Sequence, residues 1–418
     1  MKILIVSPIF PKEHNIRIDY VNSVVDSLKE KTHIEVYWLI VQPDIITENN
    51  IPEGTILDLH KFSDGVDLIK KIKPDVYLAN PTLEPINYSI SLASMFFNIP
   101  IVCFEHSFFD FSNQKNVKAN KFSLLFSDQL PTDTESQSYL LRRFRFSLFK
   151  FSFLLKTRLS LKKDFNQLIS LFKDTFNYFS GKLVKINPFG NLYLISSERS
   201  IKTSNLKIIE NKNSVIVVGN PYWDKLSSKI RNKNNSSISK IPKLLIVTNS
   251  LYEHGYWNKS QREKFLKSLF SVLSQNNFSF ALKIHPSSED KAFYESFLKK
   301  LNIQAEVFQD QYLWDIAYDY DVLISYGHSQ AITEIAYSGH KLIFLDAGIP
   351  IPKAILLKNA VDEGNAIECN FENLSIKINE ILKLSGKISE KFQNSCDSIF
   401  PKIDGKSSDK IANILLDL

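Results

Sequence analysis

The sequence predicts an α/β protein made of two doubly wound domains with parallel sheets, and three observations lead to this fold class. Apolar runs of strand length alternate with stretches of helical spacing along most of the chain, which is the order that a parallel sheet requires. The alternation stops at residues 227–242, where Lys, Asn and Ser give a linker composition. It then resumes as a second series, and 418 residues leave room for two cores.

The first domain is expected to occupy residues 1–226. It begins with the strand Lys2–Ser7, and the helix Ile16–Leu28 follows because apolar side chains recur there with helical spacing. Further strands are expected at residues 33–39, 56–59, 74–80, 101–104, 192–198 and 214–218.

Residues 112–190 break this rhythm with a helical insertion that is rich in Phe, Leu, Lys and Arg. Its densest part, residues 141–156, interleaves cationic side chains with large apolar ones. This composition suits a helix that lies on an anionic membrane, and we expect peripheral contact through residues 141–163. The alternative is a core helix whose Lys and Arg side chains extend along its rim.

The second domain is expected to occupy residues 243–418. Its first strand is 243–248, the helix 260–273 follows, and the strand 278–284 leads into the turn Lys283-Ile284-His285-Pro286. A later strand, 321–324, leads into the turn Ser325-Tyr326-Gly327-His328-Ser329-Gln330, and a helix is expected to begin after Ser329. Helices at 374–384 and 408–416 complete the chain.

The two polar turns of the second domain are the candidate functional site. Ligands of open parallel sheets bind at the carboxyl ends of the strands, so both turns face one pocket if their strands lie close together. Pro286 holds His285 in an extended conformation, and imidazole can bond a phosphate oxygen. Ser329 opens a helix whose amides favour an anion, although an ordinary N-cap explains this serine equally well. The turns therefore predict a phosphate site.

Composition limits the other classes of function. The net charge of +6 indicates an anionic partner. The basic segment lacks the groove-reading motif or strand platform of a nucleic-acid binder, so nucleic acid is not expected. Three scattered cysteines form no disulfide framework, the amino terminus does not have the pattern of a signal peptide, and no apolar run reaches a spanning length. These features predict a cytoplasmic protein.

The order of these motifs resembles the GT-B superfamily of glycosyltransferases. The residues that carry the resemblance are the strand 2–7, Gly219-Asn220-Pro221 with Asp224, the turn 283–286, the stretch 321–339 and residues 404–408. The chain looks most like bacterial surface-polysaccharide transferases with a His-Pro motif, namely capsule sialyl- and Kdo-transferases and CDP-glycerol glycerophosphotransferases. The likeness covers the second domain, and the first domain in outline.

The resemblance implies two domains that face a cleft, with the acceptor held by the first and the donor by the second. It assigns the donor phosphate to His285, Ser325 and Ser329, and a sugar or ribose contact to Glu334. The complete set of expected donor-binding residues is Asn249, Ser250, Lys283, His285, Pro286, Ser325, Gly327, His328, Ser329, Gln330 and Glu334. No Asp-x-Asp pair stands at a strand end, so the donor site is expected to need neither a metal ion nor a cofactor.

A transferase also needs a general base near the acceptor, and the first domain should supply it. Glu105, His106 and Asp110 follow one strand and are the leading candidates. Glu13, His14 and Asp19 follow the first strand and form the second set.

The predicted function is transfer of a sugar from a nucleotide sugar, with a CMP-sugar favoured, to a glycan or lipid-linked acceptor. The expected setting is bacterial surface polysaccharide assembly at the inner face of the plasma membrane. Two alternatives are a polyol-phosphate transferase of the CDP-glycerol type and a non-catalytic GT-B module that binds nucleotide sugars. The turn 325–329 departs from the Asp-Tyr-Ser-Ser kind that glycerophosphotransferases show, which favours sugar transfer.

Overall fold

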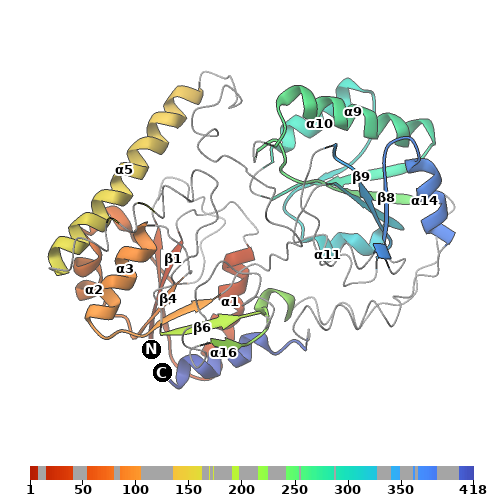
Figure 1. Cartoon of the computed structure of the whole chain (residues 1–418). Coiled ribbons are helices and arrows are strands. Elements are labelled where there is room, and N and C mark those ends of the chain that lie inside the picture. Colours follow the sequence, from red (N-terminus) through yellow and green to blue (C-terminus); the bar gives the residue numbers. More distant parts are fainter. Residues whose placement is uncertain are drawn as a thin grey trace. The chain divides into compact units, whose positions relative to one another are not determined.

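The computed structural model of the chain describes part of its residues. They are residues 1–7, 16–40, 54–79, 85–104, 135–161, 169, 173, 191–196, 215–224, 242–253, 256–286, 289–326, 340–348, 361–362, 366–383 and 404–418. They fold as two units (Figure 1). The first unit contains the described residues from Met1 to Asp224 together with residues 404–418, and the second contains those from 242 to 383.

The first unit is built on a seven-stranded parallel sheet with the order β3-β2-β1-β4-β5-β6-β7. Its strands are β1 (Lys2–Ser7), β2 (Glu35–Ile40), β3 (Thr55–Asp58), β4 (Val76–Ala79), β5 (Ile101–Phe104), β6 (Leu192–Ile195) and β7 (Val215–Val217). The chain runs from β1 to one edge of the sheet and then returns to build the other side. This is the doubly wound topology that the alternating pattern predicts.

Helices cover both faces of this sheet. They are α1 (Ile16–Lys29), α2 (Gly65–Ile72), α3 (Pro85–Phe96), α5 (Glu135–Leu161) and α16 (Ser407–Leu416), with a short 3₁₀ turn η3 (Leu59–Lys61). One core cluster contains Leu4 and Tyr77 from the sheet together with Leu68 of α2, Ile90 of α3 and Phe153 of α5. Three helices therefore pack on a single face.

The last helix, α16, belongs to the first unit. The sequence instead led us to expect that the second domain spans residues 243–418. The carboxylate of Asp224 accepts hydrogen bonds from the Ser407 and Ser408 amides at 3.1 and 2.8 Å, and the Ser27 hydroxyl donates to Asp409. Asp224 thus supplies the N-terminal cap of α16 from a distant part of the chain. An apolar pattern identifies a helix, but it does not reveal which sheet that helix covers.

The second unit is built on a six-stranded parallel sheet with the order β10-β9-β8-β11-β12-β13. The strands are β8 (Lys243–Val247), β9 (Ser279–Lys283), β10 (Val307–Phe308), β11 (Val322–Ser325), β12 (Leu342–Leu345) and β13 (Ala366–Cys369). The helices are α9 (Lys259–Gln275), α10 (Lys291–Lys300), α11 (Leu313–Ile316) and α14 (Leu374–Lys383), with the 3₁₀ turn η7 (Ala317–Asp319).

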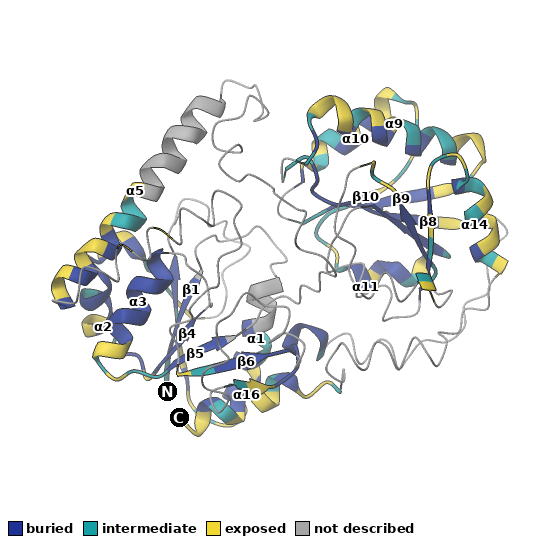
Figure 2. Cartoon of the chain, viewed as in Figure 1, coloured by how far each residue is buried: buried dark blue, intermediate teal, exposed yellow. Residues whose placement is uncertain are grey.

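The central strands of the second sheet are buried on both faces, as Figure 2 shows. Leu244 and Ile246 of β8 share a core cluster with Phe265 of α9 and Phe297 of α10. In Figure 1, α9 and α10 cover one face and α11 lies on the other. This double cover explains why these strands read as continuous apolar runs in the sequence.

The helix α5 confirms that the insertion contains a long helix. Phe153, Leu154 and Leu161 are buried against the first unit, whereas Leu148 and Leu159 are 54% and 68% exposed. Side chains of residues 135–147 lie outside the described set. Within the described ranges, no helix has both the length and the apolar character that a bilayer-spanning segment needs.

The contact between α2 and its neighbours gives a stability prediction. A Cβ on Gly65 would lie 2.9 Å from the Ser89 carbonyl oxygen and 3.2 Å from Cγ2 of Thr157, so the helices would have to separate. We expect Gly65→Ala to lower the unfolding free energy of the first unit by about 1–3 kcal/mol in urea titrations. Ser152→Ala, on the exposed side of α5, should change it by less than about 0.5 kcal/mol. Equal values for the two variants would contradict this packing.

Candidate functional site

Three neighbouring strands of the second unit end at the same level. β8 lies between β9 and β11, with Val247 paired to Lys283 on one side and to Ser325 on the other. Polar residues that follow these strands therefore gather at one edge of the sheet. The His-Pro turn and the start of the Ser325 turn satisfy the condition for a shared site, because each follows a strand adjacent to β8.

The His285–Pro286 turn is held by two side chains that the sequence did not single out. The backbone amide of His285 donates to Oε2 of Glu289 at 2.6 Å. The side-chain amide of Gln309 donates to the carbonyl oxygens of Glu289 at 2.8 Å, Pro286 at 3.3 Å and His285 at 3.4 Å. The turn is thus bonded at both its amide and its carbonyl groups.

Glu289 is the centre of a buried polar network. Its carboxylate also accepts hydrogen bonds from the hydroxyls of Thr248, at the end of β8, and Tyr294, in α10. Only 5% of Glu289 is exposed. Burial raises the pKa of this carboxyl, although the hydrogen bonds from Thr248, Tyr294 and His285 oppose the rise.

The ammonium group of Lys283 is engaged with the backbone. It donates to the carbonyl oxygens of Ile284 at 2.9 Å and Gln309 at 2.8 Å. These bonds tie the end of β9 to the segment that follows β10. A direct contact between Lys283 and a phosphate stays a prediction.

The predicted residues at the end of β11 and just after β8 differ in how their polar groups are used. The Ser325 hydroxyl is fully buried and donates to the Val247 carbonyl at 3.1 Å. Ser250 is buried as well. The side-chain nitrogen of Asn249 is buried and has no hydrogen-bond partner among the described residues. A buried donor in this condition costs about 1–3 kcal/mol, and an acceptor from a ligand would remove that cost.

A second network lies beside Glu289 and was also missed from the sequence. The Arg262 guanidinium packs between the rings of Tyr252, at 4.0 Å from the centroid, and Phe293, at 3.6 Å. It forms an ion pair of 3.1 Å with Glu253. Burial and the nearby charge of Glu289 nevertheless raise the pKa of Glu253 to about 7, because they outweigh the attraction of Arg262. A single Glu and a single Arg in an ordinary loop and helix give no signal in the sequence.

The other predicted site residues lie outside the described residues. On the donor side these are Gly327, His328, Ser329, Gln330 and Glu334. Among the candidate bases they are Glu105, His106, Asp110, His14 and Glu13. Asp19 belongs to α1, but its side chain is outside the described set.

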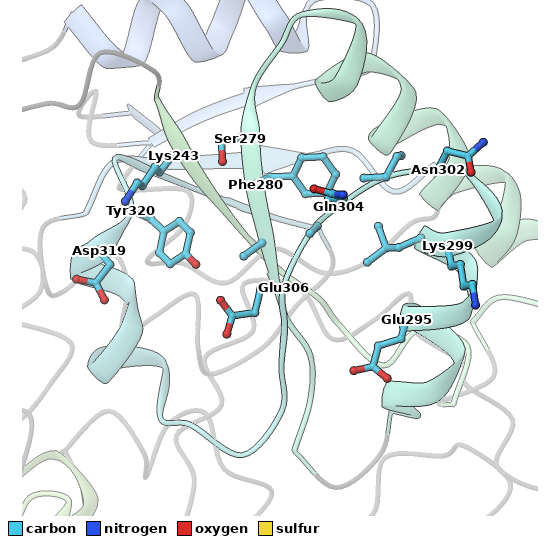
Figure 3. A pocket seen from close by; sticks show the side chains of 14 residues that line it. Lys243, Ser279, Phe280, Glu295, Lys299, Asn302, Gln304, Glu306, Asp319 and Tyr320 are labelled. Atoms are coloured by element: carbon cyan, nitrogen blue, oxygen red, sulfur yellow. The ribbon is translucent and has the colours of Figure 1, made fainter.

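A cleft of about 930 Å³ opens at the other end of the same strands (Figure 3). Lys243 and Ser279, which begin β8 and β9, line it together with Glu306 and Asp319. Its charged groups have both signs, and it lies at the amino edge of the sheet, away from the His-Pro turn. It does not contain any of the predicted site residues.

Comparisons with known proteins give structural matches alone. No family model matches the chain, and no curated protein matches it in sequence. Among solved structures, the Methanocaldococcus jannaschii UDP-GlcNAc 2-epimerase in complex with UDP-GlcNAc and UDP is 15% identical, covers 100% of both chains and has a TM-score of 0.51. The glycotransferase of kitacinnamycin is 13% identical, covers 100% of this chain and 98% of its own, and has a TM-score of 0.51.

A third similar structure is the wall teichoic acid polymerase TagF soaked with CDPG. It is 11% identical, with a TM-score of 0.52 and coverage of 99% of this chain and 88% of its own. Identities this low establish a common fold and nothing further. Together with the two parallel sheets, they show that the chain has the GT-B fold that the motif order implied.

The carboxyl of Glu253 gives a pH prediction. Its pKa rises from 4.5 to about 7 on folding, so the folded state binds the proton more tightly than the unfolded state. The resulting stabilisation is present below pH 4.5 and is lost as the pH rises through about 7. We expect the urea midpoint of the second unit to fall between pH 5 and pH 8, and Glu253→Gln to flatten that fall. If the urea midpoint of Glu253→Gln falls with pH as steeply as that of the wild type, the raised pKa does not belong to Glu253.

Proposed function

We propose that this protein is a GT-B glycosyltransferase that moves a sugar from a nucleotide-activated donor to a glycan or lipid-linked acceptor in bacterial surface polysaccharide assembly. The observation that carries the proposal is the gathering of His285, Asn249 and Ser325 at the carboxyl edge of three adjacent strands. This edge is where open parallel sheets bind phosphorylated ligands.

The donor assignment rests on the chemistry of that edge and on the similar structures. A nucleotide sugar offers phosphate oxygens as acceptors, and Asn249 holds a buried donor without a partner among the described residues. The epimerase of the same fold binds UDP-GlcNAc and UDP. A CMP-sugar remains the favoured donor because of the resemblance to capsule sialyl- and Kdo-transferases. The likeness to a polymerase soaked with CDPG supports the CDP-glycerol alternative.

In the proposed reaction the second unit stabilises the leaving nucleotide while a base from the first unit activates the acceptor hydroxyl. His285 and backbone amides meet the phosphate charge, so no metal ion is required. The Ser325 hydroxyl joins them if it turns away from the Val247 carbonyl. Glu105, His106, Asp110 and His14 remain the candidate bases.

The first test is nucleotide binding. In thermal-shift measurements with CMP, CDP, UDP and GDP, one nucleotide should raise the midpoint temperature of unfolding, because a ligand that binds the folded state stabilises it. His285→Ala should weaken that binding by about tenfold, and the sugar transfer rate by at least about a hundredfold. His33→Ala, which changes an exposed histidine of the first unit, should leave both unchanged.

The outcomes separate the alternatives. Wild-type protein that responds to no nucleotide, or a His285→Ala variant with normal turnover, would refute the proposed function. Binding without transfer would favour the non-catalytic module. Interconversion of the free nucleotide sugar would indicate an epimerase, which the same fold supports elsewhere. Transfer of glycerol phosphate would favour the CDP-glycerol type.

The proposed setting is the inner face of the plasma membrane, with α5 as the contact. Leu148, Leu155 and Leu159 are 54%, 41% and 68% exposed. At 3.6 residues per turn, they fall within about 40° of one another around the helix. This stripe lies opposite the buried face of α5. The helix carries six basic residues against one acidic residue, and one of the six, Arg158, is buried. Apolar exposure with positive charge fits an anionic lipid surface.

The membrane contact predicts a charge-reversal effect. Replacing Arg142, Arg143 and Arg145 by Glu should lower co-flotation with vesicles that contain anionic lipid by at least about fivefold, since each cation near such a surface contributes about 1 kcal/mol. Serine at positions 148, 155 and 159 should act in the same direction. The matched control replaces Lys259, Lys264 and Lys267, exposed on α9, by Glu. Equal flotation of all variants would mean that α5 is not the contact.

A further inference from the structure

The buried carboxyl of Glu289 lies four residues after His285 and joins the His-Pro turn to the end of β8. We infer that Glu289 is a positioning residue that fixes His285 for contact with the donor phosphate. This inference rests on the proposed function. It assigns the residue no contact with the donor itself.

Two strand ends meet at this carboxyl. Oε2 accepts from the His285 amide at 2.6 Å and from the Thr248 hydroxyl, so one oxygen bridges the segments that follow β9 and β8. Oε1 accepts from the Tyr294 hydroxyl, which anchors the carboxyl to α10. With 5% of the residue exposed, water does not compete effectively for these bonds. Loss of the acceptor would leave two buried hydroxyls and the half-buried His285 amide without this partner.

The turn is clamped from its other side by Gln309, which bonds the carbonyl oxygens of His285, Pro286 and Glu289. Glu289 and Gln309 therefore fix the amide and the carbonyl of the same histidine. A side chain whose backbone is held in this way can meet a ligand without first being ordered.

Burial raises the pKa of Glu289, whereas the hydrogen bonds from Thr248, Tyr294 and His285 lower it. The positioning role depends on the acceptor oxygens of the side chain. In a glutamine, the carbonyl oxygen can take the place of Oε2 and accept from the His285 amide and the Thr248 hydroxyl. The amide nitrogen then faces the Tyr294 hydroxyl, which can accept a hydrogen bond.

Other ionisable groups face this carboxyl from the neighbouring elements. Glu253 lies on the loop after β8, and Arg262 lies on α9. Tyr294 comes from α10 and Tyr326 follows β11. Ionised Glu253 disfavours a second charge on Glu289, whereas Arg262 favours one. A glutamine at 289 keeps an acceptor oxygen for the His285 amide and the Thr248 hydroxyl, so it should replace the carboxyl more faithfully than an apolar residue of similar size.

The experiment compares Glu289→Gln with Glu289→Leu. Glu295→Gln serves as the control, because Glu295 is on the same helix as Tyr294 and its side chain is 58% exposed. The first measurement is the Kd for whichever of CMP, CDP, UDP and GDP binds the wild type, with donor and acceptor KM for transfer. The second is hydrogen exchange of the peptide that contains the His285 amide, in the absence of nucleotide.

We expect Glu289→Leu to raise the nucleotide Kd and the donor KM at least about tenfold, to leave the acceptor KM unchanged, and to speed exchange at His285 at least about tenfold. Glu289→Gln should stay within about threefold of the wild type in nucleotide Kd, donor and acceptor KM and exchange rate, and Glu295→Gln should match the wild type. If Glu289→Leu does not fold, Thr248→Val can be used instead. It removes the hydroxyl that donates to Glu289 and should raise the nucleotide Kd about threefold or more.

Two results would overturn the inference. One is a folded Glu289→Leu or Thr248→Val variant with wild-type nucleotide binding, and the other is a Glu289→Gln variant as impaired as Glu289→Leu. Wild-type protein that binds none of the nucleotides would refute the proposed function instead, while exchange at His285 would still decide whether Glu289 holds the turn.

Discussion

The parallel pairing of β8 with β9 and β11 is the constraint on which the candidate site depends. Its register sets Lys283, Val247 and Ser325 side by side, so the segments after these strands begin at a common edge. Because helices cover the sheet, polar groups at that edge are buried and must find partners. The Ser325 hydroxyl and the Lys283 ammonium bond carbonyls, and Glu289 accepts three hydroxyl or amide donors.

Local features of the sequence were sufficient to predict most strands of the two sheets and the position of the His-Pro turn. The expected strands at 2–7 and 101–104 match β1 and β5, since buried parallel strands are short apolar runs between turn residues. Such patterns carry no information about partners that are distant in sequence. Asp224 capping α16 and Gln309 clamping His285 are contacts of that kind, and β10, with two residues, is too short to show a period.

The helix α5 shows why composition can leave two interpretations open. Phe153 and Leu154 are buried in the first unit, as the core interpretation requires, whereas Leu155 and Leu159 are exposed, as the membrane interpretation requires. When both faces of a helix carry large apolar side chains, the periodic signal of each weakens the other. Which face of α5 is buried depends on the positions of α2 and α3, and the sequence of α5 does not encode those positions.

The number of side-chain N–H and O–H hydrogens without a partner distinguishes residues that can bind the donor phosphate directly from residues that support the site. An ionised phosphate offers acceptors alone, so a residue that binds it must supply a hydrogen. Ser325 has one hydroxyl hydrogen and already gives it to Val247, so a contact with phosphate would forfeit a bond worth about 0.5–1.5 kcal/mol. Neither hydrogen of the Asn249 amide nitrogen has a partner within the described part of the chain. The bonding state therefore favours Asn249 as a direct ligand, with Ser325 supporting the edge on which it lies.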